Sequence, residues 1–387
     1  MSISVSEKTV ARMLAWRHQL HAIPELAYQE HKTADFVAAQ LADMGLKVER
    51  GLAGTGVVGI LEGRGSSDRV VGFRCELDAL PISETTAVNY RSRHDGRMHA
   101  CGHDGHMSMV LGAADHLSGE RNFAGTAIFV FQPAEENEGG GRRMVDEGLF
   151  ARYPIGSIYA VHNWPGVAEG HIAVRPGAMM ARFDTFDFII NGQGGHAALP
   201  HLMRDPMIAA GQVIAAVQSI VARNIDAFEQ AVVSITFVNG GEVYNVVPDV
   251  VRIGGTVRTL DDAVQDRVEA RLKAIATGLS QSLEVEIDFT YERKFPITSN
   301  ATREAGIAQR AARRVVGKEA VETDFRPSMG AEDFSVMLQN CPGAFAFLGV
   351  GPSVPGAGLH QSSYDFNDRV LGLGAAYYTA IVSEELS

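Results

Sequence analysis

The sequence predicts an α/β protein, with a larger domain built on a mostly parallel central sheet flanked by helices and a smaller inserted domain of ferredoxin-like α+β type. The length of 387 residues is too great for one ordinary core, because domains average about 150 residues. Over most of the chain, short apolar runs alternate with helical stretches, as in proteins with parallel sheets. Residues 182–291 depart from this pattern and follow the order β-α-β-β-α-β.

Residues 5–44 predict two helices with a break at Pro24. Apolar residues recur at roughly helical spacing on both sides of the break, and the stretch MGLKV ends the run. These apolar residues are Leu14, Leu20, Phe36, Val37, Leu41 and Met44.

Five short apolar runs are the expected strands of the larger domain, because each is bounded by turn residues or by a helical stretch. They are VVGILEG, DRVVGFRCELDALP, TAIFVFQPAEE, GSIYAVHNWP and, much later, GAFAFLGVG. This alternation predicts an α/β sheet.

The inserted domain is expected at residues 182–291, so that residues 1–181 and 292–387 together form the larger domain. It contains strand FDTFDFIINGQGG, a helix over 206–224, strands AVVSITFVNGG and DVVRIGGTVRTL, a helix over 262–279 and strand EVEIDFTYE. Such a split unit is a known self-contained module. Its sheet has edges, and pairing two copies under two-fold symmetry would cover one.

Composition and charge exclude several classes of protein. The formal net charge of -12, without a basic stripe, argues against a nucleic-acid binder and favours small-molecule partners. No stretch approaches the roughly 18 consecutive apolar residues of a membrane span, and the N-terminus lacks the apolar region of a secretory signal. We therefore expect a cytoplasmic protein whose thiols, Cys75, Cys101 and Cys341, are reduced.

The stretch GTGVVG matches the dinucleotide-binding fingerprint at Gly54, Gly56 and Gly59, and Asp78 follows at about the expected distance. The fingerprint requires a helix to begin at the glycines, so that its N-terminus can hold the pyrophosphate. Here the chain continues as two strands around a turn. We therefore interpret these residues as hairpin glycines.

The stretch MHACGHDGHM places Cys101 and His103 two residues apart. In extended chain this spacing puts both side chains on one face, and a thiolate with an imidazole suits Zn, Co, Ni or Mn. The alternative is a buried inert cysteine beside capping or solvated histidines. In isolation the motif does not decide between the two.

Other possible ligands follow the predicted strands. Glu135 and Glu136 come after one strand, His162 after another, and His360 lies in a glycine-rich loop after a third. Open α/β sheets bind ligands at the carboxyl ends of their strands. We therefore expect these side chains to meet Cys101 and His103 at one edge of the sheet.

The adjacent carboxylates have a chemical use beside a metal ion. One can bind a cation while its neighbour accepts a proton from the water that the cation acidifies. Glu76 and Asp78 reach the same edge, and we interpret Asp78 as a partner that orients a ligand imidazole. His196, in the inserted domain, is of the kind that is often just exposed, and sequence spacing cannot bring it to the site.

As a set, these residues resemble the metallopeptidase family that includes aminoacylase, carboxypeptidase G, hippurate hydrolase and the plant auxin-conjugate amidohydrolases. The similar stretches keep the family's order and approximate spacing nearly from end to end. They are HAIPELAYQEH, RCELDALPI, MHACGHDGHM, FQPAEE, AVHNWP, GQGGHAALPH, YNVVPD, MGAEDFS and GLHQSSYDF. The similarity is greatest to the hippurate and auxin-conjugate branch, in which a cysteine in HACGHD replaces a metal-bridging aspartate.

The resemblance implies an amidohydrolase that removes an acyl or aroyl group from the nitrogen of an amino acid, with two divalent cations (Zn, Mn, Co or Ni). Glu135 would be the general base. Residues 182–291 would be a satellite domain that forms a homodimer, or a tetramer, in which His196 reaches the partner's active site. Asn245 matches a position that contacts substrate. The implied cation ligands are Cys101, which would bridge, and His103, Glu136, His162 and His360.

Two departures and two alternatives remain open. The stretch GAMMARFDTF differs from the small, polar run that the branch usually has there. Glu76 stands where the branch usually has an aspartate, so a longer carboxylate lies near the cations. A dipeptidase or aminopeptidase of the same family would share the metal site. A catalytically silent metal-binding protein would need no free carboxylate such as Glu135, which argues against it.

Overall fold

The computed structural model describes residues 3–136, 139–351 and 358–387, and it divides the chain into two compact units. The first unit comprises residues 1–179, 299–326 and 333–387, and the second comprises 180–298 and 327–332. The chain returns to the first unit at residue 299, later than the expected residue 292, because the last long strand of the second unit, β13, continues to Phe295.

The first unit contains an eight-stranded sheet whose centre is parallel. β4, β3, β5 and β16 are neighbours in this order and run parallel, whereas β1 and β2 pair antiparallel with their neighbours. β6 pairs antiparallel with β16 and parallel with β15, so the whole sheet is mixed. The order is β1 (Lys47–Leu52), β2 (Gly56–Glu62), β4 (Ala124–Gln132), β3 (Gly65–Glu76), β5 (Ser157–Trp164), β16 (Gly343–Gly349), β6 (Ile172–Ala173) and β15 (Val321–Glu322).

The central strands are buried along most of their length, which explains why their sequences are continuous apolar runs instead of alternating ones. Phe129 in β4, Val161 in β5 and Phe345 in β16 are all within the core. Strands of this kind bury both faces only when helices cover the sheet on two sides.

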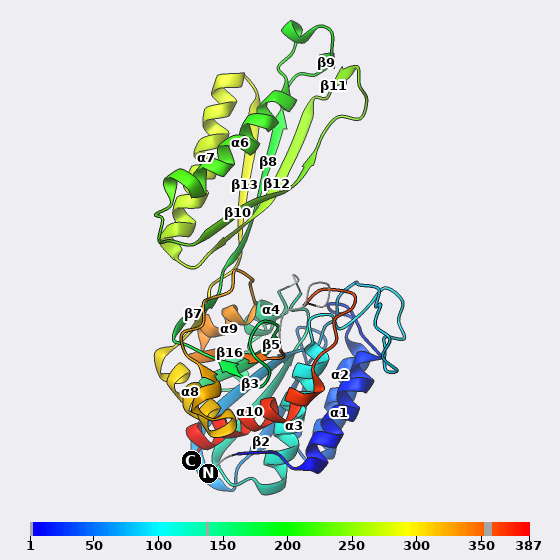
Figure 1. Ribbon diagram of the computed structural model, residues 1–387, viewed down its shortest axis with the longest axis vertical. Helices are drawn as coiled ribbons and strands as arrows, with labels where there is room; N and C mark the ends of the chain where they lie inside the picture. The colour runs from blue at the N-terminus through cyan, green and yellow to red at the C-terminus, as the bar shows by residue number, and fades with distance from the viewer. Residues whose placement is uncertain (1–2, 137–138, 352–357) are drawn as a thin grey trace. The chain divides into compact units, whose positions relative to one another are not determined.

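The helices of the first unit pack in two groups. α3 contacts α1 and α10, α8 also contacts α10, and α4 packs against α9. Gly374 of α10 lets α3 approach closely, because a Cβ atom there would lie 2.0 Å from Sδ of Met109. The helices, most of them visible in Figure 1, are α1 (Glu7–His21), α2 (His31–Asp43), α3 (His103–Glu120), α4 (Gly140–Asp146), α5 (Leu149–Arg152), α8 (Thr302–Val316), α9 (Phe334–Asn340) and α10 (Leu371–Glu385).

The glycines of GTGVVG lie in strands and a turn, as expected, although the hairpin is a different one. β1 and β2 form the hairpin, and Gly54 takes a left-handed φ of 89° in its turn. β2 and β3 follow each other in sequence but do not pair, because β4 lies between them. The helix that a dinucleotide site needs after these glycines is replaced by strand β2.

The second unit has the expected order of long elements. Its four strands are antiparallel in the order β10-β12-β8-β13, and α6 and α7 pack against each other and against this sheet (Figure 1). The elements are β8 (Phe183–Asn191), α6 (Pro206–Asn224), β10 (Ala231–Asn239), β12 (Val250–Thr259), α7 (Asp262–Leu283) and β13 (Glu286–Phe295).

Short elements complete the described chain. Two of the strands, β9 and β11, pair with each other in the second unit, and β7 pairs with β14. They are β7 (Gly177–Met180), β9 (Gly195–His196), β11 (Val246–Val247), β14 (Thr298–Asn300) and the 3₁₀ turns Pro200–Leu202, Lys318–Ala320 and Asp368–Val370.

Among the described residues, α6 alone is long and apolar enough to cross a membrane by length and composition. Asp205 caps its N-terminus by accepting hydrogen bonds from the amides of Met207 and Ile208. Val213, Val217 and Ile220 on one face of α6 are fully buried in the core of the second unit. This spacing is that of a helix packed with one face on a sheet.

Candidate metal centre

The parallel centre of the sheet explains why distant segments meet. The loops after β3, β4 and β16 begin at the carboxyl ends of neighbouring parallel strands, which is the edge where open sheets bind ligands. Glu135 and Glu136 follow β4, and His360 lies in the chain after β16. His162 lies inside β5, paired with Phe347, and not beyond the strand as its sequence suggested.

The stretch that carries Cys101 and His103 is not extended, contrary to our expectation. Helix α3 begins at His103, and Gly102 before it takes a left-handed φ of 90°. A Cβ atom at residue 102 would also lie 2.4 Å from Oδ1 of Asn163. The turn at Gly102, and not strand geometry, therefore brings the thiol and the imidazole together.

Five predicted ligands form two groups that share the thiol of Cys101. His103 and His162 complete one group, and Glu136 and His360 complete the other. The potential ligand atoms of each group lie within 4.8 Å of one another. Sγ of Cys101 is 3.4 Å from Nε2 of His162 and 3.3 Å from Nε2 of His360. This donor set, thiolate, imidazole and carboxylate, suits Zn and similar divalent cations.

The hydrogen bonds of two imidazoles leave the correct nitrogen for a cation. Nδ1 of His103 donates to the carbonyl oxygen of Asp78 at 2.8 Å, and Nδ1 of His162 donates to that of Asn163 at 2.7 Å. In the neutral imidazoles, the form that binds a cation, the Nε2 atoms therefore carry the lone pairs. Within the described chain, Nε2 of His103 is buried without a hydrogen-bond partner. An orphaned buried acceptor beside a thiol fits a metal ligand.

The electrostatics of the site also favour a cation. Burial, together with the charges of Glu136 and Glu135, raises the pKa of the Cys101 thiol well above its usual value. Burial alone would lower the pKa of His103, but the hydrogen bond with Asp78 and the charge of Glu76 raise that pKa to about 10. The surroundings thus hold excess negative charge, and a divalent cation would neutralise it and stabilise the thiolate.

Asp78 holds two of the predicted ligand segments. Besides the carbonyl contact with His103, its Oδ2 accepts a hydrogen bond from the backbone amide of Glu136 at 2.9 Å. A hydrogen bond of this kind fixes the orientation of an imidazole, and the role of Asp78 as a partner of a metal ligand stays a prediction. Glu135 is buried and forms a further group with His103 and Glu136. If cations were bound here, a carboxylate in this position could exchange a proton with a substrate held at them.

A buried polar network beneath the site was not foreseen from the sequence. Arg74, which is fully buried, donates to Glu76 and, at 2.8 Å, to Asp333. Nδ1 of His106 lies 2.7 Å from Oε2 of Glu76, and the backbone amide of Asn163 donates to Nε2 of His106 at 3.0 Å. Arg74 and His106 outweigh the effect of burial and hold the pKa of Glu76 well below its usual range. Glu76 therefore supports the segment next to His162 as an ionised group.

His196 and Asn245 belong to the second unit. His196 is exposed in β9 and pairs with Val246 of β11. The amide of Ala197 donates to the carbonyl of Asn245 at 3.1 Å, so the two predicted substrate contacts lie on neighbouring segments. The imidazole is exposed, and its Nδ1 accepts a hydrogen bond from the amide of Ala198 at 3.1 Å.

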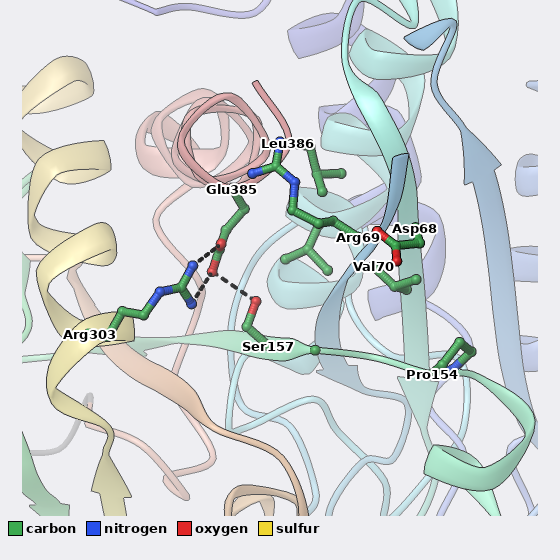
Figure 2. A pocket seen from close by; sticks show the side chains of 10 residues that line it. Asp68, Arg69, Val70, Pro154, Ser157, Arg303, Glu385 and Leu386 are labelled. Atoms are coloured by element: carbon green, nitrogen blue, oxygen red, sulfur yellow. Dashed lines mark hydrogen bonds and ion pairs between the residues drawn. The ribbon is translucent and has the colours of Figure 1, made fainter. Parts of the chain in front are cut away.

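A cavity of about 240 Å³ elsewhere in the first unit lies between the beginning of β5 and the end of α10 (Figure 2). Arg303 and Ser157 both point toward Glu385 there and hydrogen-bond to its carboxylate at 2.8 Å. Arg303 and Glu385 neutralise each other, and no predicted metal ligand is among the described residues that line the cavity. We therefore assign it no part in the metal centre.

Cys101→Ser is expected to lower the affinity for divalent cations by at least about tenfold. Losing a residue that merely supports a metal ligand already costs about that much. A hydroxyl is a far poorer anionic ligand than a thiolate near neutral pH. Elemental analysis after dialysis against limiting zinc measures the effect. Cys341→Ser is the matched control, because that buried thiol contacts the carbonyl of Ile155 instead. Equal metal content in both variants would exclude Cys101 as a ligand.

Comparison with known proteins places this geometry in context. The family model for peptidase family M20/M25/M40 matches residues 72–384. A hippurate hydrolase of Campylobacter jejuni is 38% identical over 96% of this chain and 95% of its own length. An IAA-amino acid hydrolase (ILR1-like 2) of Arabidopsis thaliana is 34% identical over 97% of this chain and 85% of its own. The crystal structure of a dinuclear metal-binding peptidase of the M20 family from Bacillus subtilis matches with a TM-score of 0.84 and 30% identity, over 97% of this chain and 98% of that one.

Proposed function

The chain belongs to peptidase family M20/M25/M40, and on this premise we propose that it hydrolyses the amide bond of N-acyl or N-aroyl amino acids. The products would be a carboxylic acid and a free amino acid. Relatives named hippurate hydrolase and IAA-amino acid hydrolase support this substrate class. The observation that carries the proposal is the meeting of two ligand groups at Cys101, with Glu135 beside Glu136.

Two divalent cations would be held by the two groups, with Cys101 common to both. His103 and His162 would complete one set of ligands, and Glu136 and His360 the other. When bound, the cations would supply Lewis-acid polarisation of the amide carbonyl and lower the pKa of the attacking water. The dinuclear metal-binding relative supports a count of two. Zn, Mn, Co and Ni all suit these donors.

Glu135 would accept the proton of the attacking water and deliver it to the leaving nitrogen. Its neighbour Glu136 faces His360, with Oε1 3.2 Å from Nε2 of that histidine, so the two adjacent carboxylates have different surroundings. Burial of Glu135 keeps water away from its proton, which makes transfer to substrate more efficient.

The second unit would serve as a satellite that forms a homodimer. Its sheet order leaves β10 at one edge, and Val232, Phe237 and Val238 of that strand are exposed apolar residues. An exposed apolar edge favours pairing with a second copy. His196 would then stabilise developing charge on the substrate in the partner subunit, with Asn245 contacting the substrate. The protein would act in the cytoplasm.

A substrate panel tests the proposal. N-benzoyl, N-acetyl and indole-acetyl amino acids are compared with dipeptides, with metal analysis of the purified protein. We expect hydrolysis of acyl amino acids that stops on chelation and returns with added Zn²⁺, Mn²⁺ or Co²⁺. A preference for dipeptides would instead establish a dipeptidase. Two bound metals without turnover on any member would support a catalytically silent metal-binding protein.

A further inference from the structure

The chain reaches Glu135 through a residue in an unusual conformation. Ala134 has a φ of 55°, in the left-handed region that non-glycine residues rarely adopt because of their Cβ atom. Ala134 is also fully buried. Surrounding contacts must therefore hold it in this conformation, and the direction in which the next two carboxylates leave the backbone depends on them.

The principal contact comes from a residue that is distant in the sequence. The amide of Ala134 donates to Oε1 of Glu30 at 2.9 Å, across 104 residues of sequence. The second oxygen of Glu30 accepts a hydrogen bond from the hydroxyl of Thr55 at 2.7 Å. Glu30 has no exposed surface, so this carboxylate is committed to these partners in a place where solvation cannot replace them.

Glu30 differs from Glu25, the other buried glutamate of the same segment. Glu25 accepts from the amide and the hydroxyl of Thr33 and so supports the first turn of α2. Glu30 directly precedes α2 but makes no side-chain capping bond to it. The carboxylate of Glu30 therefore serves the loop of Ala134 and the turn at Thr55 and not its own helix.

Two buried carboxylates thus hold alternate amides of one loop. Glu30 accepts from the amide of Ala134, and Asp78 accepts from the amide of Glu136. Glu135 lies between the two fixed points. A loop anchored on both sides of one residue leaves that side chain little freedom of direction, which is the pre-organisation that a proton-transfer group requires.

We propose that Glu30 is a positioning residue that holds the loop so that Glu135 and Glu136 both face the metal centre. This inference rests on the proposed function for the role of Glu135, but its effect on Glu136 concerns metal binding alone. Among the described residues, Glu30 is in none of the possible ligand groups. It acts through the backbone of Ala134.

The test compares Glu30→Met, which keeps the volume but removes both acceptors, with Glu30→Gln, which keeps an acceptor for the Ala134 amide. Glu30→Met is expected to lower kcat by about 10- to 100-fold with little change in KM, the usual cost of losing a supporting contact. Glu30→Gln should recover most of the rate. Glu25→Gln is the matched control, a buried glutamate of the same segment that does not contact the loop, and should behave as wild type.

A second measurement does not depend on substrate. Titration of the metal-free protein with Co²⁺ should give two binding steps in the wild type. In Glu30→Met, one step should weaken by about 10- to 100-fold, because Glu136 belongs to only one of the two groups that share Cys101. If wild type binds two Co²⁺ ions but hydrolyses nothing, the proposed function fails while this titration still decides the role of Glu30.

The conformation of Ala134 provides a rescue that a general loss of stability would not give. Adding Ala134→Gly to Glu30→Met should restore roughly 5- to 30-fold of the lost rate, because glycine adopts the left-handed region without a Cβ penalty. If Glu30→Met does not fold, Glu30→Asp, with a shorter reach, is measured in the same way. Wild-type kcat together with two wild-type Co²⁺ steps in the variant would overturn the proposal, as would failure of the glycine to restore any rate.

Discussion

Glu135→Gln is expected to lower kcat by roughly 10² to 10⁴, the usual contribution of a positioned general base. The amide has nearly the same shape as the carboxylate, but it cannot accept the proton of the attacking water. KM should change little, because the ligands that would hold the cations and the substrate carbonyl remain. Steady-state kinetics on the best acyl amino acid of the panel, with metal analysis of the same preparation, measures both effects.

Glu136→Gln is the informative companion to this variant, since the two glutamates are adjacent in one loop. We expect Glu136→Gln to lose cation affinity first and activity as a consequence, because Glu136 groups with Cys101 and His360. Excess metal should then restore part of its rate. Excess metal should do nothing for Glu135→Gln. If metal is lost from Glu135→Gln instead, the roles of the two residues are exchanged.

The convergence of the site could be predicted because it follows from the direction of the strands. Glu135, His162 and His360 belong to segments that end on, or lie in, neighbouring parallel strands of the central sheet. Apolar runs mark such strands in the sequence, and the edge at which parallel strands end is a fixed consequence of their direction. Local pattern was therefore enough to gather these residues.

Details that depend on contacts distant in sequence could not be predicted. The insertion of β4 between β2 and β3 is a choice of strand partners, and the apolar runs carry no mark of it. The start of α3 at His103 depends on Gly102, whose left-handed φ allows the turn and whose missing Cβ leaves room for Asn163. A glycine in sequence signals a turn, but it does not indicate what lies against it.

Buried charge was the least visible feature in the sequence. Arg74 lies in a strand with apolar neighbours, and the sequence pattern predicts that a single arginine in such a run is solvated. Its partners Gln132 and Asp333 are 58 and 259 residues away. Glu30 is a similar case, with Ala134 104 residues distant. Such networks are stable only when every member is present, so no single stretch reveals them.

The order of elements predicted the second unit, but its proposed role depends on the exposed apolar edge of its sheet. The alternation of buried and half-buried residues in β8, with Ile189 exposed, follows from a sheet covered by helices on one face. The exposed residues of β10 leave an apolar edge, which soluble proteins usually cover. If a second copy covers it under two-fold symmetry, each satellite is brought into contact with the other subunit.

Mixing two inactive variants is then expected to restore activity. His196→Ala and Glu135→Ala should each be nearly inactive if His196 acts in the partner subunit. A mixed dimer would contain one active site that combines an intact metal centre with an intact histidine. Random exchange gives about half mixed dimers, each with one good site, so activity should approach about a quarter of wild type. Hydrolysis by co-expressed pairs measures this, with subunit exchange verified by differently tagged chains.

His201→Ala is the matched control for the histidine, because His201 is exposed in the 3₁₀ turn that follows the same loop. It should keep full activity alone and should give no recovery with Glu135→Ala beyond its own contribution. Complementation requires that both defects fall in one site of the mixed dimer, which leaves the other site intact, and a loss of folding in either variant could not produce it. If subunit exchange is verified and the mixed dimers stay at the level of the single variants, His196 either works within its own subunit or has no role in catalysis.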